Sequence, residues 1–453
     1  MTLWGGRFAQ EPSAALWDYT VDFADRRLLE VDVEGSLAHV AMLARAGLLS
    51  GQEHVDIEGG LKQILADARD NSFEFVPGDE DVHSAVERRL VELVGAVGQK
   101  LHTGRSRNDQ IALDLRLYLR RAIADRISDL DAFIAVLVNR AEEHAETVVS
   151  AYTHLQQAQP VSFGHHLLAY AWMAGRDQDR LRDLGRRLQV SPLGAGAVAG
   201  SSLPLDPAYT AGLLGFESAF SNSIDAVSSR DLVAEFAFCV AQAMVHVSRL
   251  AEDLVLWSTS EFGWVTFTDD YTTGSSALPQ KKNPDVAELA RGRAATAIGE
   301  LTTLLVLQKG LPLAYNRDLQ EDKPPLFRAD LTLAAALKVL SGMLAVASFH
   351  PPLPSNWTVA LDLAEALVGR GVPFRQAHAA VGGLVSHLLN ENRTLAGSTI
   401  DDLQQAHELF EASDLELLDP AFSLRNRMTA GGGSPDDVRR QVEALRRQSI
   451  TSD

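Results

Sequence analysis

One short polar loop holds the residues of this chain that are best suited to do chemistry. Residues 274–284 read GSSALPQKKNP and carry two serines and two lysines. Asn283 suits the N-cap of a following helix, and Pro284 suits its first position. Hydroxyls, ammonium groups and free backbone N–H groups would then share a volume that can hold a carboxylate and accept developing negative charge. An ordinary capped helix start with a solvated lysine pair explains the same residues equally well.

A second polar segment places two arginines at the start of a long helical stretch. Residues 102–110 read HTGRSRNDQ. Guanidinium groups bind carboxylates in a bidentate manner, so Arg105 and Arg107 together with Asn108 indicate a carboxylate clamp. The alternative is a solvated cap formed by Asn108 or Asp109. That alternative is weakened because arginines oppose the helix dipole at an N-terminus.

Three further segments are more polar or richer in glycine than helix packing requires. Residues 152–160 (YTHLQQAQP) contain His154, which titrates near neutral pH, although a lone histidine more often has a structural role. Residues 192–202 (PLGAGAVAGSS) contain glycines that permit close backbone approach to a ligand, but they lack the fingerprint of a dinucleotide site. Residues 315–323 (YNRDLQEDK) fit either a solvated turn or one wall of a polar ligand site.

Long helices must position these loops, because apolar residues recur every three or four positions over several extended stretches. No glycine or proline occurs from residue 105 to residue 159. A helix of about 40 residues would span roughly 60 Å. The pattern therefore predicts an all-α fold with a helical bundle. The five predicted helices lie within residues 105–159, 165–188, 216–262, 284–309 and 326–348.

Composition changes along the chain predict three domains. A mixed helix and loop region covers residues 1–104, a central helical bundle covers 105–351, and a small helical region covers 352–453. The apolar stripes of the long helices are wide and include many alanines, which favours packing against more than one neighbour. We therefore expect a homo-oligomer in which bundles from several subunits pack together.

The bulk composition is that of a soluble globular protein, with 46% hydrophobic and 22% charged residues among 453. A formal net charge of −19 argues against a general nucleic-acid or anionic-membrane binder, so an anionic ligand needs a local cationic pocket. The single cysteine, Cys239, excludes an intrachain disulfide and a cysteine metal site. No signal peptide and no apolar run of membrane-spanning length is apparent, which predicts a cytoplasmic protein without membrane contacts.

Taken together, the polar segments resemble the argininosuccinate lyase branch of the fumarase/aspartase superfamily over almost the whole chain. Residues 274–284 resemble the superfamily signature, with Leu278 where methionine is usual. The resemblance implies a three-domain fumarase/aspartase-like fold with a central long five-helix bundle. It also implies a homotetramer with active sites shared between subunits, and reversible cleavage of argininosuccinate to L-arginine and fumarate without cofactor or metal. The segments that resemble argininosuccinate lyases in particular are residues 4–8 (WGGRF), 80–83 (EDVH), 101–110 and 315–323.

The same resemblance assigns the catalytic roles. It places the general base at Ser275, whose alkoxide would need stabilisation by loop N–H groups and Lys281. Loss of a proton next to a carboxylate gives an aci-carboxylate, whose charge Lys281, Asn283 and the N–H groups are suited to hold. His154 is paired with Glu288, one helical turn into the helix after the loop, as proton donor or organiser of the donor. The substrate-binding residues implied are Arg107, Asn108, Thr153, Asn283, Tyr315, Gln320 and Lys323.

Three positions depart from the family pattern. An early family serine falls near Thr20 and Val21, so either the Thr20 hydroxyl replaces it or that substrate contact is missing. Leu278 in place of methionine predicts only a mild packing change. Ala195 stands where many relatives carry a small polar residue, which removes a side-chain contact there.

Two rival functions fit parts of the same sequence. Another superfamily lyase, such as adenylosuccinate lyase, would use the same fold, but residues 105–110 argue against it. A non-catalytic structural relative, like the lens crystallins of this family, would not need the reactive side chains. Retention of Ser275, Lys281 and His154 argues for catalysis.

Overall fold

The computed structural model describes residues 13–21 and 23–450, with side chains described to residue 448. Helices dominate this part of the chain, and its strands form four two-stranded sheets. The all-α prediction is confirmed. The segment at residues 4–8 that resembles the family lies outside the described residues.

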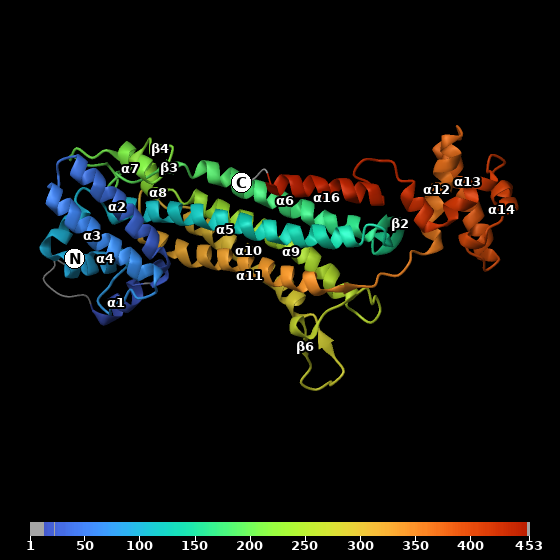
Figure 1. The fold of residues 1–453 in the computed structure, drawn as a ribbon, viewed down its shortest axis with the longest axis horizontal. Helices are drawn as coiled ribbons and strands as arrows, with labels where there is room; N and C mark the ends of the chain where they lie inside the picture. Colours follow the sequence, from blue (N-terminus) through green and yellow to red (C-terminus); the bar gives the residue numbers. More distant parts are fainter. Residues whose placement is uncertain (1–12, 22, 451–453) are drawn as a thin grey trace. The chain divides into compact units, whose positions relative to one another are not determined.

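Five long helices match the five predicted from the apolar periodicity (Figure 1). They are rich in alanine and leucine, which have high helix propensity. Their bounds are Arg107–Glu143 for α5, Phe163–Arg187 for α6, Asp231–Trp257 for α9, Asp285–Gln308 for α10 and Lys323–Val346 for α11.

Two of these helices, α5 and α9, are shorter than the stretches without glycine and proline in which they were predicted. After α5 ends at Glu143, the chain forms a hairpin of β1 (Val148–Thr153) and β2 (Gln156–Ser162). Valine, tyrosine and threonine favour strands at this point. Before α9, the Asn222 side chain accepts bonds from two backbone N–H groups and starts the short helix α8 (Ser223–Ser228). Local capping and β-branched residues therefore ended helices where no helix breaker was present.

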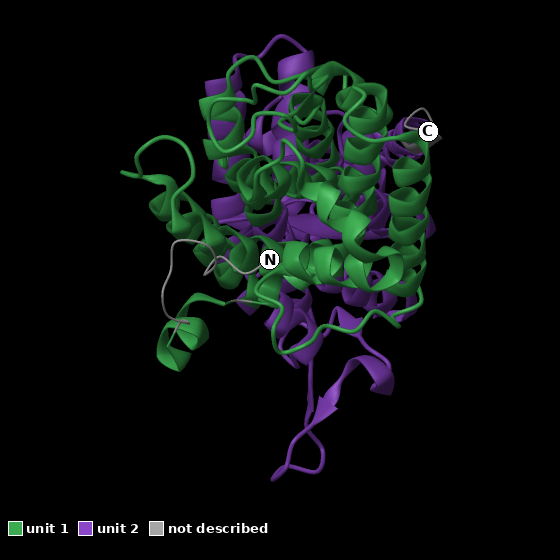
Figure 2. Ribbon diagram, turned by 90° about the vertical axis from the view of Figure 1, so that its left-hand side faces the viewer, with its two compact units in different colours: residues 1–127, 178–242, 293–334 green, residues 128–177, 243–292, 335–453 purple. Residues whose placement is uncertain are grey.

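The chain divides into two compact units, which Figure 2 colours separately. Unit 1 comprises residues 1–127, 178–242 and 293–334, and unit 2 comprises residues 128–177, 243–292 and 335–453. Each of the five long helices contributes residues to both units, because the boundaries at residues 127, 177, 242, 292 and 334 fall inside them. The three-domain division stays a prediction.

Unit 1 packs its N-terminal helices around a leucine- and valine-rich core. A Cβ atom at Gly60 would lie 2.6 Å from Leu90 Cδ1. Glycine at this position therefore lets the helix that carries Gly60 pack closely against the helix that carries Leu90. Ser50 and Glu53 form a capping box at the start of α3. The elements are α1 (Ala14–Thr20), η1 (Phe23–Leu28), α2 (Leu29–Arg45), α3 (Gly51–Arg69), α4 (Val82–Val94), η2 (Gly95–His102), β3 (Val190–Ser191), α7 (Pro207–Leu213), β4 (Ser218–Ala219) and η4 (Arg317–Asp322).

Ion pairs and side-chain hydrogen bonds join the long helices within unit 1. Arg328 on α11 makes a bidentate pair with Glu300 on α10, at 2.7 and 2.8 Å. Asp330 on α11 accepts hydrogen bonds from Tyr118 and Arg126 on α5, at 2.6 and 2.7 Å. These partly buried pairs fix the register of α5, α10 and α11 in this unit.

Unit 2 has an aromatic cluster of Phe163, Trp257, Trp264 and Phe349. His166 on α6 bonds to Asp253 on α9 at 2.7 Å. A second core lies among its C-terminal helices. The elements are β5 (Val265–Thr266), η3 (Asp269–Tyr271), β6 (Thr273–Gly274), β7 (Lys282–Asn283), β8 (Ser348–Phe349), η5 (Asn356–Val359), α12 (Ala360–Gly369), α13 (Phe374–Asn390), η6 (Leu395–Gly397), α14 (Ile400–Ala406), η7 (Ala412–Leu418), α15 (Pro420–Arg425) and α16 (Pro435–Ile450).

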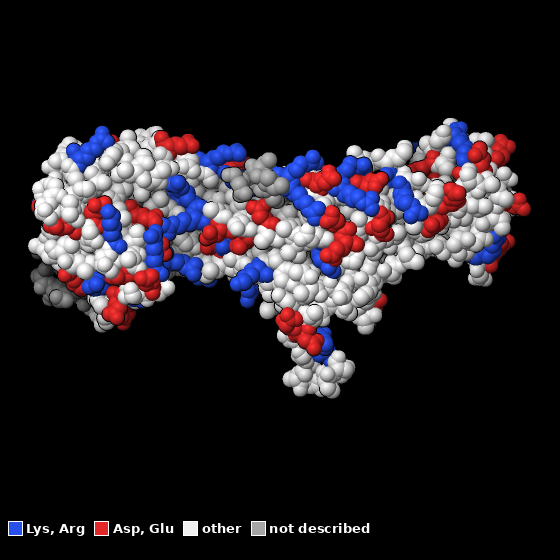
Figure 3. Space-filling model, viewed as in Figure 1, with Lys and Arg blue, Asp and Glu red and all other residues white. Residues whose placement is uncertain are grey.

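Two helical stretches are long and apolar enough to cross a membrane by length and composition alone. They are α9 and residues 317–346, and 56% and 44% of their most apolar windows are buried within the protein. Core helices of a bundle are apolar for the same reason. On the face in Figure 3, acidic and basic side chains are interspersed, without the broad basic patch that nucleic-acid binding requires.

Candidate active site

A cavity of about 250 Å³ in unit 1 brings together five of the seven residues predicted to bind substrate. They come from the start of α5, the loop before η4, η4 itself and the start of α11. Segments more than 200 residues apart in sequence therefore form one polar pocket. The five predicted residues are Arg107, Asn108, Tyr315, Gln320 and Lys323, and the other lining residues are Asp25, Glu80, Asp81, His83, Ile111 and Arg317.

The start of α5 is held in place by a buried carboxylate. Asp109 is fully buried and accepts hydrogen bonds from the backbone N–H groups of Gly194 and Gly196, at 3.0 and 2.9 Å. Both glycines have positive φ, at 105° and 62°, which side chains disfavour. The Asn108 amide donates to Ala197 O at 3.0 Å. The glycine-rich loop of residues 192–202 thus fixes the residues beside the cavity, and Asp109 does more than cap a helix.

An acidic wall of the cavity was not predicted as part of the site. Asp81 pairs with Arg107 Nε at 2.9 Å and also caps α4 by accepting from the Ser84 N–H at 2.7 Å. Asp25 accepts from the Val82 N–H at 3.1 Å. Burial raises the pKa of Asp25 to about 6, although His83 and the Val82 bond oppose the rise. The signal that could have located this wall is the EDVH segment, which resembles the family.

Another part of the cavity lining is tied to the end of α1. Arg317 and Gln320 both donate to the Thr20 carbonyl oxygen, at 2.7 and 3.1 Å. The Thr20 hydroxyl donates to Leu16 O within its own helix, at 2.8 Å. In this arrangement the backbone of Thr20, not its hydroxyl, meets the residues that line the cavity.

Lys323 enters the cavity from a buried charge network. Its ammonium group lies 3.1 Å from Asp322 Oδ1, and Asp322 is fully buried. Arg230 Nε donates to the other oxygen of the same carboxylate. One carboxylate thus neutralises two buried cations, which leaves the Lys323 side of the cavity with excess positive charge.

A buried network lies directly behind the cavity at His83. His83 Nδ1 is 2.8 Å from Asp32 Oδ1 and 3.7 Å from Asp114 Oδ2. Burial alone would lower the pKa of His83, but Asp32 raises it above its usual value. Burial raises the pKa of Asp114 well above its usual range, and the charge of Asp32 adds to the rise. The three side chains have the spacing of metal ligands, and the close contact of His83 with Asp32 links two of them.

In unit 2, the polar loop of residues 274–284 forms the tip of a small hairpin. Strands β6 and β7 pair Gly274 with Lys282. The Ser275 hydroxyl oxygen accepts from the backbone N–H groups of Ala277 and Leu278, at 3.3 and 3.1 Å. Two N–H dipoles directed at one oxygen favour negative charge on it.

The other polar residues of this loop lie along the hairpin and the start of α10. Lys281 donates to the Asn283 side-chain oxygen. Asn283 does not cap the helix as predicted, because α10 begins at Asp285 and the Pro284 carbonyl accepts from the Glu288 N–H at 3.1 Å. The strand pairing of Lys282 and Asn283 moved the helix start by one residue.

His154 lies at the tip of a different hairpin, not at the end of a helix as expected. Thr153 pairs with Gln156, so His154 and Leu155 are the two turn residues, and both have φ of 56°. This is the backbone of a type I′ turn, which normally favours asparagine and glycine. The turn holds the imidazole outward, and Thr153, His154 and Leu155 are all exposed.

The predicted pairing of His154 with Glu288 is not made within one chain. Both side chains are exposed. No hydrogen bond or ion pair joins them among the described residues. The structure therefore groups the predicted substrate-binding residues of unit 1, while the predicted catalytic residues of unit 2 stand on two exposed hairpin tips and the first turn of α10.

Comparison with known proteins gives the family. A family model described as lyase matches residues 6–299, and one described as argininosuccinate lyase C-terminal matches residues 357–425. The argininosuccinate lyase of Frankia casuarinae is 49% identical and covers 98% of this chain and 97% of its own. That of Syntrophus aciditrophicus is 46% identical and covers 98% and 95%. The chain belongs to the argininosuccinate lyase family.

Solved structures agree with the fold of this family. EDDS lyase in complex with formate superposes with a TM-score of 0.80 at 29% identity, over 95% of this chain and 88% of that one. An EDDS lyase variant with bound fumarate gives the same TM-score at 28% identity, with the same coverage. The class II fumarase of Schistosoma mansoni has a TM-score of 0.73 at 18% identity, over 87% and 90%, which shows the fold alone. The fumarase/aspartase-like fold is thereby confirmed.

Proposed function

We propose that this chain cleaves argininosuccinate reversibly to L-arginine and fumarate as a carbon–nitrogen lyase that needs no cofactor. The observation that carries the proposal is the unit 1 cavity, in which five predicted substrate-binding residues meet. Family membership supports the reaction, because relatives 42–49% identical over nearly their full length are argininosuccinate lyases. The reaction would serve arginine biosynthesis or the urea cycle in the cytoplasm.

The charges of the cavity suit a substrate with both ammonium and carboxylate groups. Arg107 and Lys323 supply positive charge for carboxylates, and Asn108, Tyr315 and Gln320 supply polar contacts. The acidic wall formed by Asp25, Glu80 and Asp81 supplies negative charge for amino or guanidinium groups. Thr153 and Asn283, from the two hairpins of unit 2, complete the proposed binding set.

Ser275 is the proposed general base. Its oxygen already accepts two backbone N–H groups, which would stabilise the alkoxide that must take the proton. Removal of the proton next to a carboxylate moves the electron pair onto that carboxylate. Lys281 and Asn283 would hold the resulting aci-carboxylate, which then collapses to fumarate as the C–N bond to the guanidinium nitrogen breaks.

His154 is the proposed proton donor, or the residue that orients the donor, for the departing nitrogen. Its left-handed backbone is uncommon for residues other than glycine, and such backbone strain is tolerated where a side chain must be aimed. Glu288 would orient the imidazole and favour its charged form.

Sharing of active sites between subunits of a homotetramer would bring these regions together. The hairpin tips that carry His154 and Ser275 are exposed in one chain. Large apolar side chains are also exposed along the long helices, and a second copy of the chain would cover them. These residues are Phe238 and Val245 on α9, Leu289, Ile298, Leu305 and Val306 on α10, and Leu331 and Val346 on α11.

The direct test is to add purified protein to argininosuccinate and to follow fumarate by its ultraviolet absorbance. Fumarate and arginine should appear in equal amounts, and the reverse reaction should consume both. Turnover of adenylosuccinate without turnover of argininosuccinate would contradict the proposal. Absence of turnover with both substrates, in folded oligomeric protein, would instead favour a structural role.

A further inference from the structure

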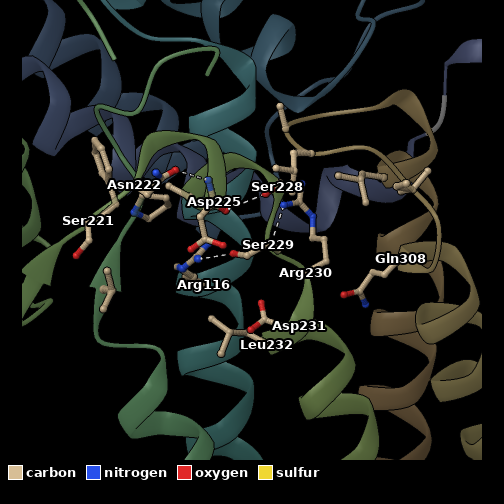
Figure 4. Close-up of a pocket in the computed structure, with 18 of the residues that line it drawn as sticks. Arg116, Ser221, Asn222, Asp225, Ser228, Ser229, Arg230, Asp231, Leu232 and Gln308 are labelled. Atoms are coloured by element: carbon tan, nitrogen blue, oxygen red, sulfur yellow. Dashed lines mark hydrogen bonds between the residues drawn. The ribbon is translucent and has the colours of Figure 1, made fainter. Parts of the chain in front are cut away.

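Unit 1 contains a second and larger cavity that the proposed reaction does not use. Its volume is about 740 Å³, and it lies among α5, α8, the start of α9 and the segment after α10 (Figure 4). None of the residues assigned to catalysis or substrate binding lines it. Apolar side chains line part of it, namely Val190, Phe220, Leu311, Leu313 and Leu319.

Two arginines line this cavity, the buried Arg230 and the partly buried Arg116, and each has one N–H group without a partner among the described residues. Arg116 donates to Ser229 Oγ at 2.9 Å and to Ala112 O at 3.1 Å, but its Nε has no partner among the described residues. Arg230 is 2% exposed and donates to Asp322 and to backbone carbonyls, yet its Nη2 has no partner there. A buried N–H group without an acceptor is costly, so each arginine can take one more acceptor.

The positive charges of the Arg116 and Arg230 guanidinium groups also repel each other. Burial lowers the pKa of Arg116 to about 10, and the charge of Arg230 adds to the decrease. Asp225 and Asp231 oppose this effect, but both are exposed to solvent. An anion placed between the arginines would relieve their repulsion and satisfy the open N–H groups.

We propose that this cavity binds a small organic monocarboxylate. Arg116 and Arg230 hold the carboxylate, and the apolar wall that includes Phe220 and Leu311 takes a short hydrocarbon chain. The rim carboxylates Asp225 and Asp231 disfavour a second negative charge on the ligand. The Ser229 hydroxyl, which accepts a hydrogen bond from Arg116, would be a further polar contact for the ligand.

The cavity is linked by two contacts to the candidate active site. Arg230 shares the carboxylate of Asp322 with Lys323, and Lys323 lines the smaller cavity. A carboxylate that binds Arg230 weakens the hold of Arg230 on Asp322, and this strengthens the pairing of Asp322 with Lys323. Lys323 is then a weaker partner for substrate, so the ligand raises KM. This second step, unlike binding itself, rests on the proposed function.

Binding is tested by calorimetric titration of the oligomer with 4-methylpentanoate, using 4-methylpentanamide and inorganic phosphate as comparison ligands. We expect saturable binding of the carboxylate and at least tenfold weaker binding of the neutral amide and of phosphate. No saturable binding of the carboxylate would overturn the proposal, as would a cavity filled by a second subunit. Equal binding of amide, or tighter binding of phosphate, would overturn the assigned ligand class.

Matched variants place the binding in this cavity. Arg116→Gln should weaken it at least tenfold, whereas Arg187→Gln should not, because Arg187 is half exposed and already paired with Glu235. Leu232→Glu adds a negative charge to the lining, and Leu232→Gln adds none at similar size. Loss of binding in the glutamate variant alone supports the site even if Arg116→Gln misfolds. Equal binding in both Leu232 variants would overturn it.

Kinetics then separate the two proposals. With argininosuccinate, 4-methylpentanoate should raise KM severalfold in the parent enzyme and in Leu232→Gln, but not in Leu232→Glu. Binding without any change in KM would remove the coupling and leave the ligand site. Absence of all argininosuccinate turnover would contradict the proposed function and leave the binding result unaffected.

Discussion

The proposed substrate-binding cavity of unit 1 and the proposed catalytic loops of unit 2 differ in how completely one chain builds them. In unit 1, Asp81, Asp109 and Asp322 already hold the side chains or backbone around the cavity. In unit 2, His154 and most of the 274–284 loop are exposed, and the hydrogen bonds of Ser275 and Lys281 lie within their own hairpin. We therefore propose that a single chain preorganises substrate recognition and that assembly completes the chemistry.

The largest expected effect comes from the catalytic side of this comparison. Ser275→Ala removes the proposed base, so kcat should fall by about 10³-fold or more, while the substrate still meets an intact unit 1 cavity. Fumarate release gives kcat, and calorimetry with argininosuccinate gives binding.

Ser276→Ala is the matched control, because the two serines are adjacent in the same loop. It should retain most of the activity. Near-normal turnover of Ser275→Ala would exclude Ser275 as the base, and equal losses in both variants would point to a general disturbance of the hairpin.

Mixed oligomers test whether the two regions come from different chains. Arg107→Gln disables the unit 1 cavity, and Ser275→Ala disables the unit 2 loop. In an equal mixture, half of the cavities and half of the loops are unmutated. If each site combines a cavity and a loop from two subunits, random hybrids should therefore recover up to about a quarter of the parent activity.

The measurement is fumarate release after the two variants are dissociated, mixed and reassembled. Each variant reassembled alone is the control and should stay inactive. Hybrids that form but recover no activity would place both regions of a site in one chain.

The sequence predicted the five long helices well because apolar periodicity and helix propensity are local properties. It did not predict the hairpin at His154, where strand pairing of Tyr152 and Thr153 overrides a stretch without helix breakers. It predicted Arg107, Asn108 and Lys323 beside one cavity only through family resemblance. Asp25 was missed because its position follows from a tertiary contact, the Val82 N–H bond, that no local pattern encodes.

The acidic wall of the unit 1 cavity should affect stability as pH changes. Burial raises the pKa of Asp25 from 3.8 to about 6 in the folded chain. Between these values the folded state keeps a proton that the unfolded state releases, so stability falls as pH rises through this window. Above pH 6 the loss is complete and amounts to roughly 2–3 kcal/mol as an upper bound.

Asp25→Asn should remove this loss, because the amide oxygen can still accept from the Val82 N–H and no charge is buried. Urea unfolding of parent and variant at pH 4, 5, 6 and 7 measures the difference. The variant should gain relative stability across pH 4–6 and then stay level. A constant difference at every pH would show that Asp25 does not titrate in this window.

The smallest effect is expected at Leu278, where the loop departs from the superfamily signature. Leu278 is 48% exposed, and its backbone N–H, not its side chain, bonds to Ser275. Leu278→Met conserves volume and leaves that N–H in place, so kcat and KM should change less than about twofold and stability by less than about 1.5 kcal/mol. Leu278→Pro removes the N–H and should lower kcat strongly at unchanged substrate affinity. If the two variants behaved alike, the N–H groups around Ser275 would not support the base, and the exposed loop would act through its side chains instead.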